Sequence, residues 1–300
     1  MAFNVDALSE QVKLADGFKL ATKAVSEAKL AKALISSGNF QAGVQGRAPI
    51  MKMDSSITLQ KQGCGRVAGA GDTRFTEKYL EVEKLAVYKD ICYDVLEGTY
   101  MSQALAKGDD PEDAILKPEY TNQILDKEIA LVNAVVETAL FQADKTSSDA
   151  NLNKFDGIKK QLAGVTATEV EGATIVEKLQ ALYMAMPEVD RLKEDAHIFL
   201  SETLYEEYKL ALWAKDRYRE EASGVLAATS IKLFPTAGLN GSREVYAMRL
   251  ENLQLGFNGS PESTKFDLWY DKASNIFMQN TFFSIGISVV HPEDVRKATV

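Results

Sequence analysis

Histidine and cysteine are both scarce in this sequence, with two of each among 300 residues. The histidines are His197 and His291, and the cysteines are Cys64 and Cys92. A zinc site, a histidine-based catalytic site or a disulfide framework would have almost no side chains to draw on. The two cysteines are far apart and form no C-x-x-C motif, so we expect two buried or free thiols. This poverty favours a structural or binding role.

An excess of basic residues is also absent. The formal net charge is -9 and the pI is about 5.0, which argues against a general nucleic-acid binder with its dominant basic surface. No window approaches the roughly 20 apolar residues of a membrane span, and acidic Asp6 and Glu10 stand where a signal peptide would be apolar. We expect a chain made and kept in a cytosol. The length fits one large domain or two interleaved lobes.

Two long helices are predicted from composition and periodicity. From Val5 to about Ser36 the chain lacks proline, but few large apolar residues define a face. We therefore expect an N-terminal arm without a core of its own, packed on a neighbouring element or subunit. Pro118 opens the clearest helix, which runs to about Lys145 over about 40 Å. Its apolar stripe steps by three or four residues: Leu125, Ile129, Val132, Val136, Leu140 and Ala143. Polar residues flank one side of that stripe: Asp126, Asn133, Glu137 and Asp144.

A glycine-rich stretch separates two strand patterns. Ser56–Gln62 alternates weakly, and Thr76–Tyr88 alternates with Leu80 and Val82 on one face. The four glycines between residues 63 and 72 are typical of the flexible tip of a long hairpin. They lack the lysine and hydroxyl of a phosphate-binding loop and lead into a strand, so no nucleotide site is expected. The hairpin has too few apolar residues to bury both faces, and we expect it to lie on another subunit.

A second lobe is predicted after the polar loop at residues 146–153. Thr174 and Glu177 form a capping box at the start of one helix, and Ser201 caps another. Before the spine helix, a short helix is also predicted at residues 94–106. Apolar strands are predicted at residues 197–200, 231–234 (stopped by Pro235), 244–257 and 266–270, with an alternating tail at 283–289. The pattern indicates an α/β lobe with a small sheet.

The candidate catalytic residues have no catalytic partner or motif near them in the sequence. His197 lies in an apolar strand, which indicates a core histidine, and His291 near a strand end indicates a surface residue; neither accompanies a nucleophile motif. Acidic pairs such as Glu206–Glu207 are typical of solvated faces and not of converging carboxylates. The acidic run at residues 109–113 could attract a divalent ion weakly, but it lacks the glycine and terminal glutamate of an EF-hand. Four aromatic residues either pack in the core or form a subunit contact: Tyr205, Tyr208, Trp213 and Tyr218.

The order of these parts is specific: a helical arm, a glycine-tipped hairpin, a long spine helix, an α/β lobe and a terminal strand. Three stretches add to it: Phe75–Tyr100, which ends in KDICYDVLEGTY, then Lys154–Ile158, and the closing FDLWYDKASNIFMQNTFFSIGISVVHPEDV. On these features nearly the whole chain resembles the major capsid proteins of tailed bacteriophages. The resemblance implies an α+β architecture, the Hong Kong 97-type fold, in which an extended hairpin loop lies over a neighbouring subunit.

The resemblance also implies a division of the chain. Its expected parts are an N-terminal arm (1–55), the extended loop (56–88), a peripheral domain with the spine helix (89–153), an axial domain (154–234), and an axial-domain loop and return strand followed by the closing strands of the peripheral domain (235–300). The expected subunit-interface residues of the extended loop are Gly65, Arg66, Gly69, Gly71, Arg74, Tyr79, Glu81 and Glu83. The expected residues near a capsomer centre are Pro235, Gly238, Leu239 and Asn240. No catalytic residue, metal or cofactor is implied.

The implied function is self-assembly into hexamers and pentamers of an icosahedral head that encloses double-stranded DNA without binding it specifically. The shell would form in the host cytoplasm and reside in the virion, with portal, scaffold or decoration proteins as partners and no membrane contact. The acidic charge suits a shell into which the duplex must slide. Three alternatives stay open: a cellular, encapsulin-like nanocompartment shell around a cargo enzyme, a soluble acidic enzyme, and another virion protein such as a decoration or tail component.

Overall fold

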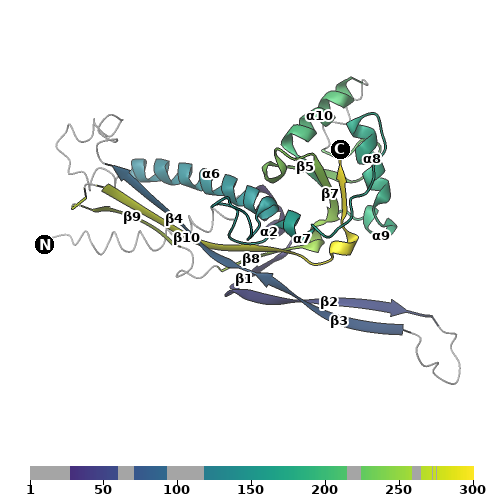
Figure 1. Ribbon diagram of the computed structural model, residues 1–300, viewed down its shortest axis with the longest axis horizontal. Coiled ribbons are helices and arrows are strands. Elements are labelled where there is room, and N and C mark those ends of the chain that lie inside the picture. The colour runs from purple at the N-terminus through teal and green to yellow at the C-terminus, as the bar shows by residue number, and fades with distance from the viewer. Residues whose placement is uncertain are drawn as a thin grey trace.

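The computed structural model of the chain describes residues 28–59, 71–92, 118–214, 224–258, 265–271, 273–274 and 276–300. Figure 1 shows an elongated molecule in which a long helix lies along a sheet, a rounder lobe of helices and strands stands at one end, and a two-stranded ribbon projects away from the body. The helices are α2 (Lys29–Ser36), α6 (Pro118–Gln142), α7 (Ile158–Gln161), α8 (Ile175–Ala185), α9 (Glu188–Arg191) and α10 (Glu202–Trp213), with 3-10 turns η1 (Ala237–Leu239), η2 (Leu250–Asn252) and η3 (Pro292–Asp294). The strands are β1 (Phe40–Ala42), β2 (Arg47–Ile57), β3 (Gly71–Glu81), β4 (Glu83–Cys92), β5 (Ala196–Ser201), β6 (Lys232–Thr236), β7 (Glu244–Arg249), β8 (Leu253–Phe257), β9 (Lys265–Asp271), β10 (Ile276–Val289) and β11 (Arg296–Thr299).

The spine helix and a five-stranded sheet form the long part of the body. The sheet has the order β1-β8-β10-β4, and β9 also pairs with β10. Helix α6 lies along this sheet in Figure 1. The predicted stripe on α6 is confirmed for Ile129, Val132, Val136, Leu140 and Ala143, all of which are buried in the main core. The side chain of Leu125 lies outside the described residues.

The second lobe is built on a four-stranded sheet of order β11-β7-β5-β6, with α8 and α10 packed beside it. Every residue of the central strand β5 is buried. Phe199 points into the main core, whereas Ile198 and Leu200 point into a separate core under α8 and α10. One strand therefore joins the two hydrophobic cores, because alternate side chains of a strand leave its opposite faces.

The predicted helix starts in this lobe are confirmed. The backbone N–H of Glu177 donates to the Thr174 hydroxyl, and that of Leu204 donates to the Ser201 hydroxyl at 3.2 Å. The Glu177 carboxylate accepts from the backbone N–H of Ala173 at 2.9 Å. Both caps satisfy amides that have no acceptor within the helix.

The predicted strands of the hairpin are wrong in their boundaries. The first strand is Arg47–Ile57, which pairs antiparallel with Gly71–Glu81, and residues 60–70 lie outside the described residues. Pro49 interrupts no wider sheet because the ribbon has only two strands and both edges are open. The predicted strand Thr76–Tyr88 is two strands, since the chain leaves the ribbon at the buried Val82 and then joins β10.

Other sequence-based boundaries also differ from the structure. The strand predicted to stop at Pro235 includes it, which the edge position of β6 allows. The predicted strand 244–257 is broken by η2 into β7 and β8, which belong to different sheets. The spine helix ends at Gln142 and not near Lys145. Most of the predicted N-terminal helix and the short helix at residues 94–106 lie outside the described residues.

Candidate assembly surface

The ribbon β2–β3 exposes large apolar side chains on one face, where charged Arg47 and Glu77 also lie. Paired residues on antiparallel strands share a face, so the register Met53 with Phe75 and Pro49 with Tyr79 places these side chains together. We call this face the outer ribbon face; its exposed apolar residues are Met51, Met53, Ile57, Phe75 and Tyr79. Between 41% and 82% of each of these side chains is exposed. The opposite face carries Lys52, Arg74, Thr76 and Lys78.

The opposite face is held against the chain's own body at the base of the ribbon. Ile50 and Leu80 are buried there with Val82 and Val290. The Lys52 ammonium forms an ion pair with Glu293, and the Lys78 ammonium donates to the carbonyl of Val289. Because both lysines lie on this face, the apolar side chains of the outer ribbon face point away from these two contacts.

A second set of contacts fixes the point where β3 turns into β4. The Lys145 ammonium lies 2.7 Å from Glu81 and 3.7 Å from Glu83. A Cβ atom added to Gly286 would lie 1.8 Å from the carbonyl oxygen of Glu81. The backbone of β10 therefore approaches this turn more closely than any residue with a side chain would allow. The ribbon departs from a rigid, closely packed base.

The charges at this base follow from the same contacts. The hydrogen bond from Lys145 lowers the pKa of Glu81 and raises the pKa of Lys145. Burial lowers the pKa of Lys78, and the negative charge of Glu293 opposes that effect. Burial acts to raise the pKa of Glu293. The hydrogen bond and positive charge of Lys52, together with hydrogen bonds from a backbone N–H and from His291, outweigh burial and bring that pKa to about 2. The Glu293 carboxylate is therefore ionised at neutral pH.

The predicted residues of the extended loop fall into three groups. Gly65, Arg66 and Gly69 lie outside the described residues. Gly71 and Arg74 lie on the exposed distal half of β3, and Tyr79 lies on the outer ribbon face with the Arg47 guanidinium 4.3 Å from its ring centre. Glu81 is exposed and Glu83 is half-buried, and both carboxylates pair with Lys145 of the same chain. Their contact with another subunit stays a prediction.

The four residues predicted near a capsomer centre are not equally accessible. Gly238 and Leu239 are buried, and Leu239 belongs to the main core. A Cβ atom on Gly238 would lie 2.5 Å from the Phe141 ring, so η1 packs directly on the spine helix. Asn240 is exposed and Pro235 is half-buried. A contact with another copy would have to use these last two residues.

The isolated catalytic candidates have structural surroundings. His197 is buried, and its Nδ1 lies 2.8 Å from the carbonyl oxygen of Asp195; burial lowers its pKa. Its interpretation as a core histidine is confirmed. Tyr208 is also a core residue, whose hydroxyl accepts from the backbone N–H of Ala227 at 2.8 Å. Trp213 is exposed, Cys92 is an exposed free thiol, and Tyr218 and Cys64 lie outside the described residues.

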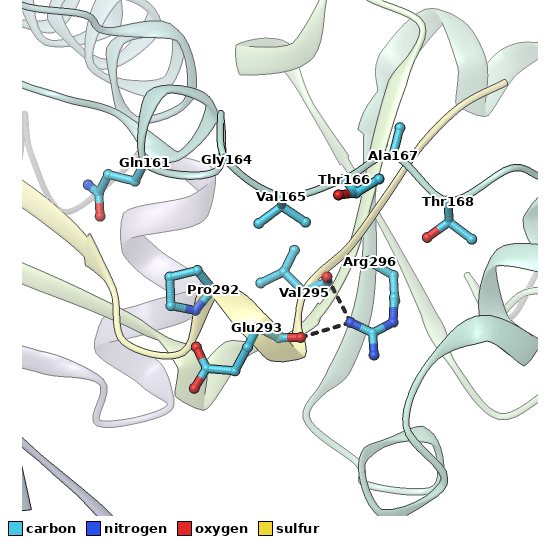
Figure 2. Close-up of a pocket in the computed structure, with 10 residues that line it drawn as sticks. All are labelled: Gln161, Gly164, Val165, Thr166, Ala167, Thr168, Pro292, Glu293, Val295 and Arg296. Carbon is cyan, nitrogen blue, oxygen red and sulfur yellow. Dashed lines mark hydrogen bonds between the residues drawn. The ribbon is translucent and has the colours of Figure 1, made fainter.

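A cavity of about 550 Å³ lies between the loop at residues 164–168 and the turn η3. Figure 2 shows Val165 and Val295 pointing toward one another within it, with Pro292 and Glu293 on the turn side. Its arginine, Arg296, donates to the carbonyl oxygens of Ala185, Glu293 and Val295, so the guanidinium holds backbone together. The guanidinium in this cavity thus joins the end of α8 to the turn η3.

One group of possible metal ligands occurs in the described part of the chain: His291, Glu293 and Asp294. The Lys52 ammonium already neutralises Glu293, so the group has a cation of its own. Among the residues that the structure describes, no helix combines the length and the apolar character needed to cross a bilayer.

Comparison with known proteins gives the fold a context. No protein-family model and no curated protein matches the sequence. Solved structures do match, at low identity but over most of both chains. A chain of the satellite phage P4 procapsid, solved with its size determination (Sid) protein, has a TM-score of 0.58 at 10% identity and covers 90% of this chain and 89% of that one. The capsid of Myoviridae phage XM1 gives 0.54 at 12% identity, with 89% and 91% covered. The capsid of cyanophage A-1(L) gives 0.57 at 11% identity, with 87% and 90% covered.

The chain has the fold of phage capsid proteins. The match extends over nearly all of the chain in each comparison, so it includes the sheet with the spine helix as well as the second lobe. The helices and sheets of the structure confirm the mixed α+β architecture that the resemblance implies. Identities of 10% to 12% mean that the likeness resides in the path of the backbone and not in shared side chains.

Proposed function

We propose that this chain is a major capsid protein that assembles into the head shell of a tailed phage, as a structural protein and not an enzyme. The capsid fold supports the proposal, and the outer ribbon face carries it. Exposed apolar side chains on a long two-stranded ribbon cost free energy in water, and a ribbon of two strands has little stability unless it packs on something. A neighbouring copy supplies that missing cover.

The open face of the five-stranded sheet is the surface we propose for receiving the ribbon. Its residues include Tyr88 and Trp269, which are exposed, and Met278 and Phe282, which are half-buried. They are neighbours in the sheet, because Met278 pairs with Trp269 and the rings of Tyr88 and Phe282 lie 5.9 Å apart. The opposite face is buried at Phe277 and other odd-numbered positions of β10. Aromatic and methionine side chains on both surfaces are the residue types enriched at interface centres.

The division into domains is part of the same proposal. The ribbon at residues 47–81 takes the role of the extended loop, and the sheet with α6 that of the peripheral domain. The lobe around β5 takes the role of the axial domain that meets its copies in hexamers and pentamers. The shell would enclose double-stranded DNA in the virion, with portal, scaffold or decoration proteins as partners. The net charge of -9 suits a wall that must not hold the duplex, and a strongly basic interior surface would contradict this.

Two adjacent residues of β3 provide a matched test. Phe75 lies on the outer ribbon face and Thr76 on the opposite face, and both are exposed. We expect the full wild-type chain to form capsomers or closed shells in size-exclusion chromatography and negative-stain microscopy. Phe75→Glu should abolish these assemblies at an unchanged unfolding midpoint, because a charge would be desolvated in the interface. Thr76→Glu adds the same charge outside the interface and should assemble.

A stable 33.0 kDa monomer at all salt concentrations, also in the presence of other virion proteins, would overturn the proposal. Equal assembly of both variants would show that the outer ribbon face is not part of the subunit interface. The contents of the particle distinguish a phage head from a cellular nanocompartment: DNA in particles from a phage lysate is expected here, whereas an enclosed enzyme would contradict the viral assignment.

A further inference from the structure

The outer side of the spine helix carries an apolar stripe that the described residues leave exposed. It consists of Ala130, Leu131, Ala134 and Val135, and Leu131 is 55% exposed. We call it the spine stripe. These residues are three or four positions apart in turn, so they share one side of α6, opposite the core positions Val132 and Val136. Two alanines in the row would allow another helix to approach closely.

The root of the N-terminal segment is fixed next to this stripe. Glu137 on α6 is buried, and its Oε2 accepts from the backbone N–H of Leu30 in the first turn of α2 at 3.0 Å. Its Oε1 accepts from the Thr236 hydroxyl at 2.5 Å. A carboxylate at this position satisfies an amide that has no acceptor in its own helix and is stabilised by the helix dipole. Ala28, the first described residue, is buried in the same core.

Helical geometry connects this root to the stripe. Ala134 lies about one turn before Glu137 on α6, and Ala130 lies about two turns before it on nearly the same side. A chain that arrives at Ala28 along α6 would therefore cross Ala134 and Ala130. Residues 1–27 would span about 40 Å as a helix, and the 25 residues of α6 span about 37 Å. The segment has the length to cover the whole stripe.

The sequence of the segment also fits this position. Leu14, Phe18, Ala21 and Val25 recur at intervals of three or four residues, and the series continues in phase to the buried Ala28. Such a narrow apolar stripe needs one partner surface and is too small to form a core alone. The side chain of Phe18 is the largest in the series, and it would lie against the small residues of the spine stripe.

We propose that residues 1–27 of this chain dock as a helix on the spine stripe of their own subunit, anchored at their root by Glu137. The docked segment covers Leu131 and its neighbours before assembly, so the subunit presents the outer ribbon face and not the spine stripe to other copies. This inference goes beyond the shell function and holds whether or not the shell encloses DNA.

Hydrogen exchange on the full chain tests the docking. The double variant Leu131→Glu, Val135→Glu places two charges on an exposed side of α6, where glutamate is a good helix former. We expect amides of residues 5–27 to exchange at least ten-fold faster than in the wild type, with the same unfolding midpoint. Leu210→Glu, at an exposed position of α10, is the control and should leave that exchange unchanged. Identical exchange of residues 5–27 in the double variant and the wild type would overturn the proposal.

Disulfide trapping identifies which subunit supplies the segment. In a Cys64→Ser, Cys92→Ser background, Ala21→Cys and Ala134→Cys would bring one thiol from each surface together. Oxidation should give a cross-linked species that migrates as a monomer. A cross-linked dimer would show that the segment comes from another copy and would overturn the assignment to the same subunit. Absence of any cross-link under oxidation that modifies both thiols would overturn the docking itself.

Discussion

Strands β3 and β5 are both extended segments, but they have opposite surroundings. All six residues of β5 are buried, because two hydrophobic cores of the same chain cover its two faces. In β3, eight of the first ten positions are exposed, and Leu80 alone is buried. The difference does not come from apolar content alone, since β3 and its partner β2 carry Phe75, Met51 and Met53. The chain completes the burial of β5 by itself and leaves that of the ribbon to another molecule.

The largest expected effect on the folded subunit is in β5. Phe199→Ala should lower the free energy of unfolding by about 3–5 kcal/mol, because it leaves a cavity where the two lobes meet. Phe75→Ala removes the same atoms from an exposed position and should change that free energy by about 0.5 kcal/mol or less. Urea unfolding of the full chain in its unassembled form measures both. Similar losses for the two variants would show that the ribbon belongs to the core.

A smaller effect is expected where the ribbon joins the body. Gly286→Ala would place a methyl group against the carbonyl of Glu81 and should destabilise the chain by about 1–3 kcal/mol as the β3–β4 turn is displaced. Gly164→Ala is the matched control, since a Cβ atom there meets nothing within 4 Å. Thermal unfolding compares the two. Tolerance of alanine at residue 286 would mean that the base of the ribbon is not rigid.

The smallest effect concerns the ion pair between Lys52 and Glu293 and depends on pH. The pKa of Glu293 is about 2 in the folded chain, against an ordinary value of 4.5. The stabilisation is therefore complete above pH 4.5 and is lost as the pH falls toward 2, because the unfolded chain takes up the proton first. Glu293→Gln should flatten the decline in the unfolding midpoint between pH 5 and 2, whereas Glu169→Gln, at an exposed position, should leave it unchanged. Equal slopes in wild type and Glu293→Gln would argue against the ion pair.

The regular elements of the body could be predicted from sequence because their periodicity is strong. The stripe of α6 and the caps at Thr174 and Ser201 depend on spacing alone, and the structure confirms them. The strand boundaries of the ribbon were harder to predict from the sequence. Most ribbon residues face solvent in a single chain, so no buried face imposes an apolar pattern. The alternation of Leu80 and Val82 shifts by one residue at Leu85 and Val87, and this shift is the sequence signal for the change from β3 to β4 that the prediction of a single strand missed.

Residues fixed by distant contacts were not predictable. Glu137 lies beside the apolar stripe of α6, at a position that indicates a solvated flank, yet α2 and β6 bury it. Gly238 and Leu239 were expected near a capsomer centre from resemblance alone, whereas packing of η1 on α6 covers them. No local sequence pattern indicates the burial of Glu137 or of Gly238 and Leu239, because each depends on elements about 100 residues away. The ion pair between Lys52 and Glu293 is of the same kind, with a separation of 241 residues.

Oxidation of methionine in free and assembled protein tests the role of the outer ribbon face most directly. Met51 and Met53 are exposed in the subunit, and peroxide converts accessible methionine to its sulfoxide. Mass spectrometry after a limited peroxide pulse would give the rate at each residue. The proposed assembly predicts that both methionines react readily in dissociated subunits and at least ten-fold more slowly in shells. Equal rates in the two forms would contradict it, because the outer ribbon face would then remain in water after assembly.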